Sequence, residues 1–453
     1  MPLFFRILHS SYRRGAHWSQ FVRSRVTVAG WMALAMLVLA AVLGGDVGRS
    51  RLYQLFALIF ALVAVGMLWA WTRRARLAAR RMLPRHATVG EECRYTVEVQ
   101  NDGRFPARAF WLREVPPDPC PELKQFAATP EPGEENRNAF DRLFVYYRWR
   151  WLLERNLMFR GGRSTELLDL PAGEAKRVQL TLVPRRRGVI RFDDLRALLP
   201  DPFGLFQRCR WVLAPEDSLV VLPKRYRLPP LDLPGASQFQ IGGEAVSNTI
   251  GLSGEFIGLR DYRPGDAMRH IHWKNWAKTG EPIVKEFEDT YFPRYGLVLD
   301  NFVDPGAGDL FEEAVSVAAS FAVSIDTKRS LLDLMFVKDK AIVVSAGRGL
   351  ARAEKMLEML AAVEAEPVEK LESLARLVRR YHGELSACVC VFAGWSEERA
   401  EFIRNLARGG MELTALIVCR TADEAQRLLA EFPVPCRVIL LEHGRVQEGL
   451  MTL

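Results

Sequence analysis

The 453-residue sequence has no CxxC pair, no glycine-rich phosphate loop and no recognisable nucleophile motif. Its seven cysteines are an odd number and are spread along the chain. This favours free thiols in a reducing compartment over disulfide bonds or a zinc site. Cys388 and Cys390 lie two positions apart in a strand-like run, so both side chains are expected on one face of that strand. These absences remove the commonest sets of catalytic, phosphate-binding and metal-binding residues.

Acidic residues are almost missing from the first 83 residues, which hold twelve arginines, no lysine and one acid, Asp46. This segment therefore carries a net charge of +11. The whole chain carries +8, so the remaining 370 residues carry the difference, −3. A domain that binds the phosphate backbone is itself basic, and the larger part of this chain is not. The charge distribution excludes nucleic acid as a partner.

Two runs within the N-terminal segment 1–83 contain no charge, residues 26–45 and 53–71. A helix needs about 20 apolar residues to cross a bilayer. Each run therefore predicts a transmembrane helix, and the short loop between them makes the pair a helical hairpin. Five arginines precede the first run, five follow the second and two lie in the loop. The positive-inside rule then places both termini, and everything after the second span, in the cytoplasm.

From Pro84 to about residue 222 the chain consists of short stretches in which apolar and polar residues alternate. Residues 93–117 predict a strand, a tight turn at Asn101-Asp102-Gly103 and a second strand, which together form a β-hairpin. Several short strands at this spacing predict a β-sandwich domain over residues 84–222. The domain contains no cluster of a nucleophile, an acid and a base.

One segment rich in arginine and aromatic residues, 137–163, interrupts this pattern. As a helix it would align Phe140, Phe144, Tyr147 and Trp151 on one face. As a strand it would alternate aromatic residues with arginines. The segment is thus either an ordinary strand of the sandwich or an element that contacts membrane lipid on the anionic cytoplasmic leaflet. The pattern favours neither.

Residues 293–453 alternate apolar strands with helices. This predicts an α/β domain with a mostly parallel sheet that is covered by helices on both faces. Residues 330–347 predict two strands around a turn at Asp339-Lys340. Ligands of such sheets bind beyond the carboxyl ends of the strands, and Asp300 lies at the end of the first strand.

The stretch RDYRPGDAMRHIHWKNWAK, residues 260–278, is dense in charged and aromatic residues. Its segment Arg263-Pro264-Gly265-Asp266 predicts a type II turn, with glycine at the position that needs a positive φ. The aspartate of this turn is expected to cap a short helix that ends at Gly280. On that helix, Met268 and Ile271 are expected to face a common core.

An enzyme would use Asp261, Asp266, His270 and His272 of this stretch as acid–base groups, but the stretch supplies no nucleophile. The two histidines lie two positions apart and would diverge by about 200° on a helix, so they do not readily share one metal ion. A catalytic role is therefore the less favoured interpretation.

A structural lock or a docking surface explains the same stretch without catalysis, and the sequence leaves these two roles open. In a lock, its arginines pair with acids and its tryptophans pack at the junction of the β and α/β domains. In a docking surface, the polar face binds a protein partner. The residues assigned to the lock or docking surface are Arg260, Tyr262, Arg263, Pro264, Gly265, Asp266, Arg269, His272, Trp273 and Lys274.

Three features together resemble a bacterial and archaeal family, domain of unknown function fifty-eight. They are the double membrane span, the stretch RRRGVIRFDDLRALLPDPFGLF, and the stretch GEFIGLRDYRPGDAMRHIHWKNWAKTGEPIVKEFED before the α/β domain. The resemblance implies that residues 293–453 are similar to a von Willebrand factor type A domain, with residues 223–292 as the connector. It also implies partners, because members are usually encoded beside a MoxR-type AAA+ ATPase and often beside a transglutaminase-like membrane protein.

Type A domains commonly bind Mg²⁺ through Asp-x-Ser-x-Ser at the end of the first strand, with a Thr and an Asp from later loops. Here Phe302 stands where an oxygen ligand is needed, which leaves Asp300 and Asp304 as a degenerate metal site. Mg²⁺ requires several oxygens in near-octahedral directions, so we expect no metal and no other cofactor. Asp300 is instead expected to cap the following loop or helix, or to pair with a base such as Lys274 or Lys278.

The patterns and the resemblance together imply a membrane-anchored, non-enzymatic adaptor or scaffold of the bacterial inner membrane. It would present its type A-like domain to protein partners on the cytoplasmic side, with a MoxR-type AAA+ ATPase as the first expected partner. The alternative is a membrane-proximal hydrolase that uses the Asp/His-rich stretch.

Overall fold

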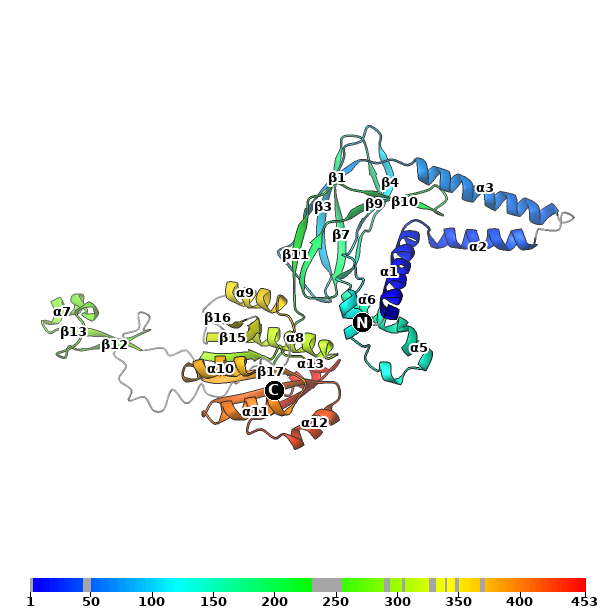
Figure 1. The fold of residues 1–453 in the computed structure, drawn as a ribbon. Coiled ribbons are helices and arrows are strands. Elements are labelled where there is room, and N and C mark those ends of the chain that lie inside the picture. Colours follow the sequence, from blue (N-terminus) through cyan, green and yellow to red (C-terminus); the bar gives the residue numbers. More distant parts are fainter. Residues whose placement is uncertain are drawn as a thin grey trace. The chain divides into compact units, whose positions relative to one another are not determined.

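The computed structural model describes residues 3–43, 50–229, 255–288, 294–303, 306–325, 331–338, 340–346, 350–366 and 371–453. It is a mixture of helices and sheets (Figure 1). The chain forms two compact units. The first consists of Met1–Arg225, Val303–Ala319 and Leu357–Ala365, and the second consists of Tyr226–Phe302, Ser320–Met356 and Glu366–Leu453.

Three helices begin the first unit: α1 (Leu3–Arg23), α2 (Val28–Leu43) and α3 (Ser50–Thr72). The part Tyr53–Thr72 of α3 is long and apolar enough to cross a membrane, whereas the apolar part of α2, Val28–Val42, is shorter. Among the described residues there is thus one helix of sufficient length where the sequence predicts two. α2 and α3 lie alongside each other (Figure 1).

The predicted first span is shortened because its first residues bond to the β-sheet domain instead of joining the helix. Val26 forms a β-bridge with Phe206. The backbone nitrogen of Thr27 donates to the carbonyl of Leu205 at 3.1 Å. The helix therefore begins at Val28.

Two β-sheets of the first unit share one buried core, which is the arrangement of a sandwich. The larger sheet has the order β1-β3-β7-β5-β4-β9-β10, with β6 paired to β4, and the smaller has the order β2-β11-β8. Buried residues alternate along β3 because successive side chains point to opposite faces. The strands are β1 (Leu77–Met82), β2 (His86–Thr88), β3 (Cys93–Asn101), β4 (Ala107–Glu114), β5 (Phe159–Ser164), β6 (Leu168–Leu170), β7 (Ala175–Pro184), β8 (Gly188–Phe192), β9 (Leu195–Pro200), β10 (Gln207–Trp211) and β11 (Asp217–Leu222).

The predicted hairpin of β3 and β4 is wrong, because β7 and β5 lie between these strands in the sheet. The fully buried side chain of Asn101 redirects the chain. Its Nδ2 donates to the carbonyls of Phe105 at 3.0 Å and Leu170 at 3.1 Å. Its Oδ1 accepts from the nitrogen of Gly103 at 3.0 Å. This set of bonds stabilises a corner in place of a tight turn.

Residues 137–163 form neither the predicted strand nor the predicted helix face. They contain α5 (Ala139–Phe144), α6 (Tyr146–Asn156) and the start of β5. Val145 joins the two helices in a left-handed conformation with φ 47°, which breaks the helical periodicity. The buried face of α6 is therefore Arg148, Trp149 and Leu152, and Phe140 of the expected face is exposed.

Helix α1 packs on α6 and on the preceding α4 (Leu123–Ala128); the short η1 (Glu134–Asn136) lies between α4 and α5. Leu8 of α1 joins Phe126, Trp149 and Leu152 in a small buried cluster. The hydroxyl of Tyr12 donates to the carbonyl of Phe144 at 2.8 Å. Part of the aromatic surface of residues 137–163 is thus covered by the N-terminal helix.

The second unit contains a six-stranded sheet in the order β16-β15-β14-β17-β18-β19. Its pairs are parallel except for β15 and β16, so the predicted mostly parallel sheet is confirmed. Counted along the chain this is the doubly wound order 3-2-1-4-5-6, whose switch point lies between β14 and β17. The strands are β14 (Arg294–Leu299), β15 (Leu331–Lys338), β16 (Lys340–Ala346), β17 (Ala387–Ala393), β18 (Glu412–Cys419) and β19 (Arg437–Glu442).

One face of this sheet is covered by α10, α11 and α12, whose apolar side chains share a core with it. Cys388 and Cys390 point to that face as predicted, with their Sγ atoms 3.9 Å apart. The remaining helices are α8 (Gly308–Ser324), α9 (Leu350–Ala361), α10 (Leu371–Tyr381), η5 (His382–Glu384), α11 (Glu397–Ala407), α12 (Ala422–Glu431) and α13 (Val446–Leu450).

Candidate functional site

Residues 255–288 form a small structure, hereafter the motif module. Strands β12 (Glu255–Asp261) and β13 (Ile283–Glu288) pair in antiparallel fashion. Between them lie the 3-10 turn η3 (Met268–His270) and helix α7 (Trp273–Thr279). Ile271 is buried and bridges the buried Val284. The core of the motif module thus includes Ile271 and Val284, and a long, largely polar segment connects β12 to β13.

Asp266 organises that connection through charge. The guanidinium of Arg260 donates two hydrogen bonds to its carboxylate, both at 2.7 Å, and the nitrogen of Arg263 donates a third at 2.8 Å. The bonds from Arg260, and then the bond from Arg263, lower the pKa of Asp266 to about 2. The predicted turn is confirmed by the positive φ of Gly265 and by the bond from the Asp266 nitrogen to the Arg263 carbonyl.

The predicted helix cap, however, is wrong. His272 caps α7, because its Nδ1 accepts from the nitrogen of Asn275 at 3.1 Å. Asp266 is engaged by Arg260 and lies before a 3-10 turn that has no side-chain cap. The stop at Gly280 is confirmed, with φ 77°. Among the described residues Arg269 pairs with no acid, contrary to the expectation; its Nε contacts Nε2 of the neighbouring His270 at 3.2 Å.

The apolar side chains of the motif module are distributed differently from the expectation. Ile271 is buried as predicted, but Met268 is 68% exposed, so its expected burial is wrong. Trp273 is 57% exposed and stacks on Trp276 of the same helix, with ring centroids 5.3 Å apart. The other exposed residues assigned to the lock or docking surface are Arg263, Pro264, Gly265, Arg269 and Lys274; Tyr262 is partly buried.

Asp300 lies at the switch point of the sheet, where its nitrogen donates to the carbonyl of Val391 in β17 at 2.9 Å. The side chain of Asp300 is fully buried and is engaged by Arg399 of α11. Arg399 Nε donates to Asp300 Oδ2 at 2.7 Å, and its terminal nitrogen donates to the carbonyl of Phe302 at 2.7 Å. Asp300 Oδ1 accepts from the nitrogen of Phe302 at 3.0 Å, which confirms the expected loop cap.

These residues do not fit a magnesium ion. The guanidinium of Arg399 holds the carboxylate that would be the first ligand, and Phe302 offers no side-chain oxygen. Asp304, the second expected carboxylate, lies outside the described residues. In the described part of the chain Asp300 pairs with Arg399 and not with Lys274 or Lys278 as expected. The sequence gives no sign that Arg399 is the partner of Asp300, because the two residues lie 99 positions apart.

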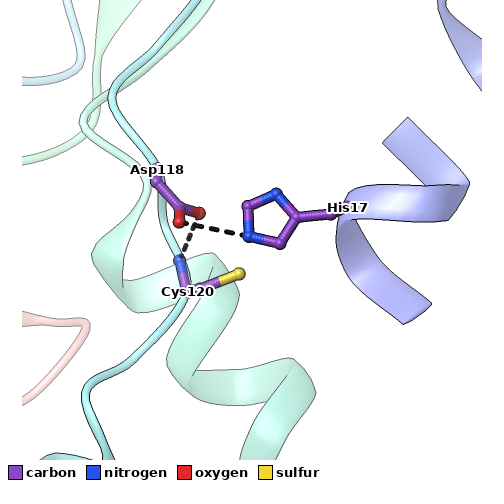
Figure 2. Close-up of side chains that lie close together, drawn as sticks. All are labelled: His17, Asp118 and Cys120. Atoms are coloured by element: carbon purple, nitrogen blue, oxygen red, sulfur yellow. Dashed lines mark hydrogen bonds and ion pairs between the residues drawn. The ribbon is translucent and has the colours of Figure 1, made fainter. Parts of the chain in front are cut away.

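A second cluster of polar groups, His17, Asp118 and Cys120, was not expected from the sequence (Figure 2). Asp118 lies 3.5 Å from His17 Nε2 and accepts from the nitrogen of Cys120 at 3.1 Å. Burial, and then the bond to Asp118, raise the pKa of the Cys120 thiol to about 12. A cysteine binds zinc only as the thiolate, so the raised pKa of Cys120 disfavours a zinc site. The carboxylate of Asp118 also has a basic neighbour, since Arg13 lies 3.8 Å from it. The arrangement is that of a polar contact between α1 and the segment before α4.

The family match falls on the part of the chain that holds the motif module and Asp300. Residues 258–428 match the family described as "Protein of unknown function DUF58". The chain is also 24% identical over 358 residues to "Uncharacterized protein YeaD" of Bacillus subtilis (strain 168), covering 77% of this chain and 79% of that protein. The range 258–428 that matches the family contains Arg399 as well as the motif module from Gly258 onward.

Solved structures give only faint likenesses. The CARDB domain of the PF1109 protein from Pyrococcus furiosus is 13% identical, with a TM-score of 0.18, over 33% of this chain and 89% of that one. The ASH / PapD-like domain of human CEP192 is 14% identical, with a TM-score of 0.17, over 33% of this chain and 89% of that one.

Proposed function

We propose that this chain is a member of the DUF58 family that acts as a membrane-anchored, non-enzymatic adaptor. It is anchored in the bacterial inner membrane by α2 and α3 and presents a type A-like domain and the motif module to protein partners in the cytoplasm. A MoxR-type AAA+ ATPase is the first partner, and a transglutaminase-like membrane protein is the second.

The observation that carries the proposal is the exposure of large apolar side chains on a motif module that is internally braced. Trp273 and Met268 lie more than half exposed, while the bonds of Asp266 and His272 stabilise the backbone that carries them. Tryptophan and arginine are the residues that contribute most often to the energy of protein interfaces. A rigid module with these side chains outward is suited to binding a protein.

The engagement of the polar groups argues against the hydrolase interpretation. A general base must reach a proton on its substrate. Asp266 is instead held ionised by Arg260, and His272 uses Nδ1 to accept the bond that begins α7. The buried Asp300 is engaged by Arg399. These side chains have structural partners in place of a shared catalytic arrangement.

Co-purification from membranes tests the proposal. Three forms of the full-length chain are each expressed with a MoxR-type AAA+ ATPase of the same organism. They are the wild type, the double variant Met268→Ala/Trp273→Ala, and Trp211→Ala. Trp211 is an exposed tryptophan of the sandwich, at 72% against 57% for Trp273. Loss of an anchor residue of an interface costs roughly thirtyfold in affinity, so the double variant is expected to lose the ATPase and Trp211→Ala to retain it. Equal recovery in all three, with unchanged melting temperature, would contradict the proposal.

A further inference from the structure

A cavity of about 840 Å³ lies in the first unit, where the carboxyl-terminal end of α3 meets β10 and the link between α1 and α2. We call this cavity the basic cavity. Its walls differ in character: α3 contributes Met67, Leu68 and Trp71, and β10 contributes Arg208 and Arg210. Neither the motif module nor the Asp300 site takes part in it.

The frame of the basic cavity is rigid because the loop between β9 and β10 fits against two glycines of the helices. A Cβ atom on Gly30 would lie 2.1 Å from the carbonyl oxygen of Leu205, and one on Gly66 would lie 2.5 Å from Asp201 Oδ2. The hydroxyl of Thr27 donates to the carbonyl of Gly204 at 2.6 Å. At Gly30 the approaching atom is a backbone carbonyl, and so close an approach needs glycine. The walls of the cavity are therefore fixed relative to one another.

The helix wall is apolar and open. Met67 is 55% exposed, Leu68 is 61% exposed and Trp71 is 73% exposed. They lie in the last turns of the helix that is apolar enough to cross a membrane. Tryptophan at the end of such a helix is typical of the membrane interface. This wall is suited to an acyl chain.

The strand wall carries positive charge without a counterion. Arg208 and Arg210 alternate with Cys209 along β10, so their side chains leave the same face of the strand. No acidic side chain among the described residues lines the basic cavity, and neither arginine has an ion-pair partner in the described part of the chain. The Nε of Arg210 is buried without a hydrogen-bond partner.

The surroundings add to this excess of charge. Partial burial, and then the positive charges of Arg210, Arg74 and Arg25, lower the pKa of Arg208. The positive charges of these arginines repel one another, and an anion bound among them would relieve the repulsion. A phosphate group accepts hydrogen bonds from arginine in paired geometry.

We propose that the basic cavity binds one anionic phospholipid, with its phosphate against Arg208 and Arg210 and an acyl chain along Met67, Leu68 and Trp71. The inference rests on the membrane anchoring proposed above. Free phosphate would leave the apolar wall uncovered, and a neutral lipid would leave the net charge of the arginines uncompensated. A phospholipid with a net negative charge satisfies both walls.

Quenching of Trp71 by brominated lipid tests this inference on the full-length chain in phosphatidylcholine nanodiscs. Brominated phosphatidylglycerol is compared with brominated phosphatidylcholine, and the signal of Trp71 is the difference between wild type and Trp71→Phe. We expect a preference for the anionic lipid that falls by about thirtyfold in Arg208→Gln/Arg210→Gln, since each arginine near an anionic surface contributes about fivefold. The control Arg94→Gln/Arg177→Gln removes two arginines that are about 70% exposed and is expected to keep the preference.

The following results separate the explanations. Equal quenching by both lipids would overturn the inference, and so would displacement of the anionic lipid by inorganic phosphate, which would define a phosphate site. Arg208→Lys/Arg210→Lys retains the charge but not the paired geometry and is expected to retain part of the preference, which keeps the inference testable if the glutamine variant unfolds. Release of the protein from membranes by a carbonate wash would instead contradict the anchoring itself.

Discussion

The carboxylate of Asp266 determines the geometry of the motif module more than any other single group. It joins the end of β12 to the turn that follows, through Arg260 and the nitrogen of Arg263. The turn and the stop at Gly280 could be predicted from the sequence because glycine positions are set by local backbone geometry. The cap of α7 could not, because His272 and Asp266 are both able to accept a backbone bond and only the fold decides between them.

The lowered pKa of Asp266 gives a prediction with a definite sign. A carboxyl group whose pKa falls on folding stabilises the folded state at every pH above its ordinary value of 3.8, and this contribution is lost as the pH falls through about 2. Hydrogen exchange of residues 258–266 in the full-length chain, corrected for intrinsic rates, should show protection that is constant down to about 3.8 and then decreases.

Two variants test the assignment to Asp266. Asp266→Asn should show weaker protection at neutral pH and little change between neutral and acidic pH. Asp261→Asn removes an exposed acid of the same motif module and should keep the wild-type profile. A profile that is the same in wild type and Asp266→Asn would assign the pH dependence to another group.

At the scale of elements, buried polar side chains explain where the sequence-based prediction fails. Alternation and periodicity identify β3, β4 and the strands of the α/β sheet, because these patterns are local. Asn101, which separates β3 from β4, and Arg399, which joins α11 to β14, act across 69 and 99 positions. No local pattern contains such partners, so the hairpin and the partner of Asp300 were predicted incorrectly.

The bond between Arg399 and Asp300 should be a large contributor to stability. Both side chains are almost fully buried, at 4% and 0% exposure. Arg399→Met leaves the carboxylate without this partner, and the loss of one member of a buried pair costs about 3–5 kcal/mol. The free energy of unfolding should fall by this amount in chemical denaturation. Arg408→Met, on the exposed end of α11, should change it by about 0.5 kcal/mol or less.

The same pair also predicts the response to metal. Because Arg399 already neutralises Asp300, the wild-type chain should show no saturable Mg²⁺ binding in calorimetry. Saturable binding that is abolished by Asp300→Ala would show that the site binds a metal in spite of the guanidinium.

At the scale of the molecule, the composition predicted a basic, membrane-proximal end and a separate α/β domain. The α/β sheet has the predicted strand types, and one N-terminal helix has the length of a span. The interlocking of the β9–β10 loop with α2 could not be foreseen, because Thr27 and Gly204 are 177 positions apart. This contact shortens α2 and links the helices to the sandwich.

The proposed topology has its own test. Five arginines precede the first apolar run, five follow the second and two lie between the runs, so reporter fusions after residue 90 should be active only on the cytoplasmic side. A fusion there that is active on the outer side would contradict the topology while leaving the folded domains as described.

The most direct test of the adaptor account is an aromatic photo-crosslinking amino acid, which keeps a large ring in place of Trp273, at position 273 of the full-length chain in its native membrane. Position 211, another exposed tryptophan, is the matched control. The account predicts that illumination joins position 273, and not position 211, to a distinct protein, identified by mass spectrometry as the AAA+ ATPase. Crosslinks only to lipid at position 273, or the same products at both positions, would contradict it.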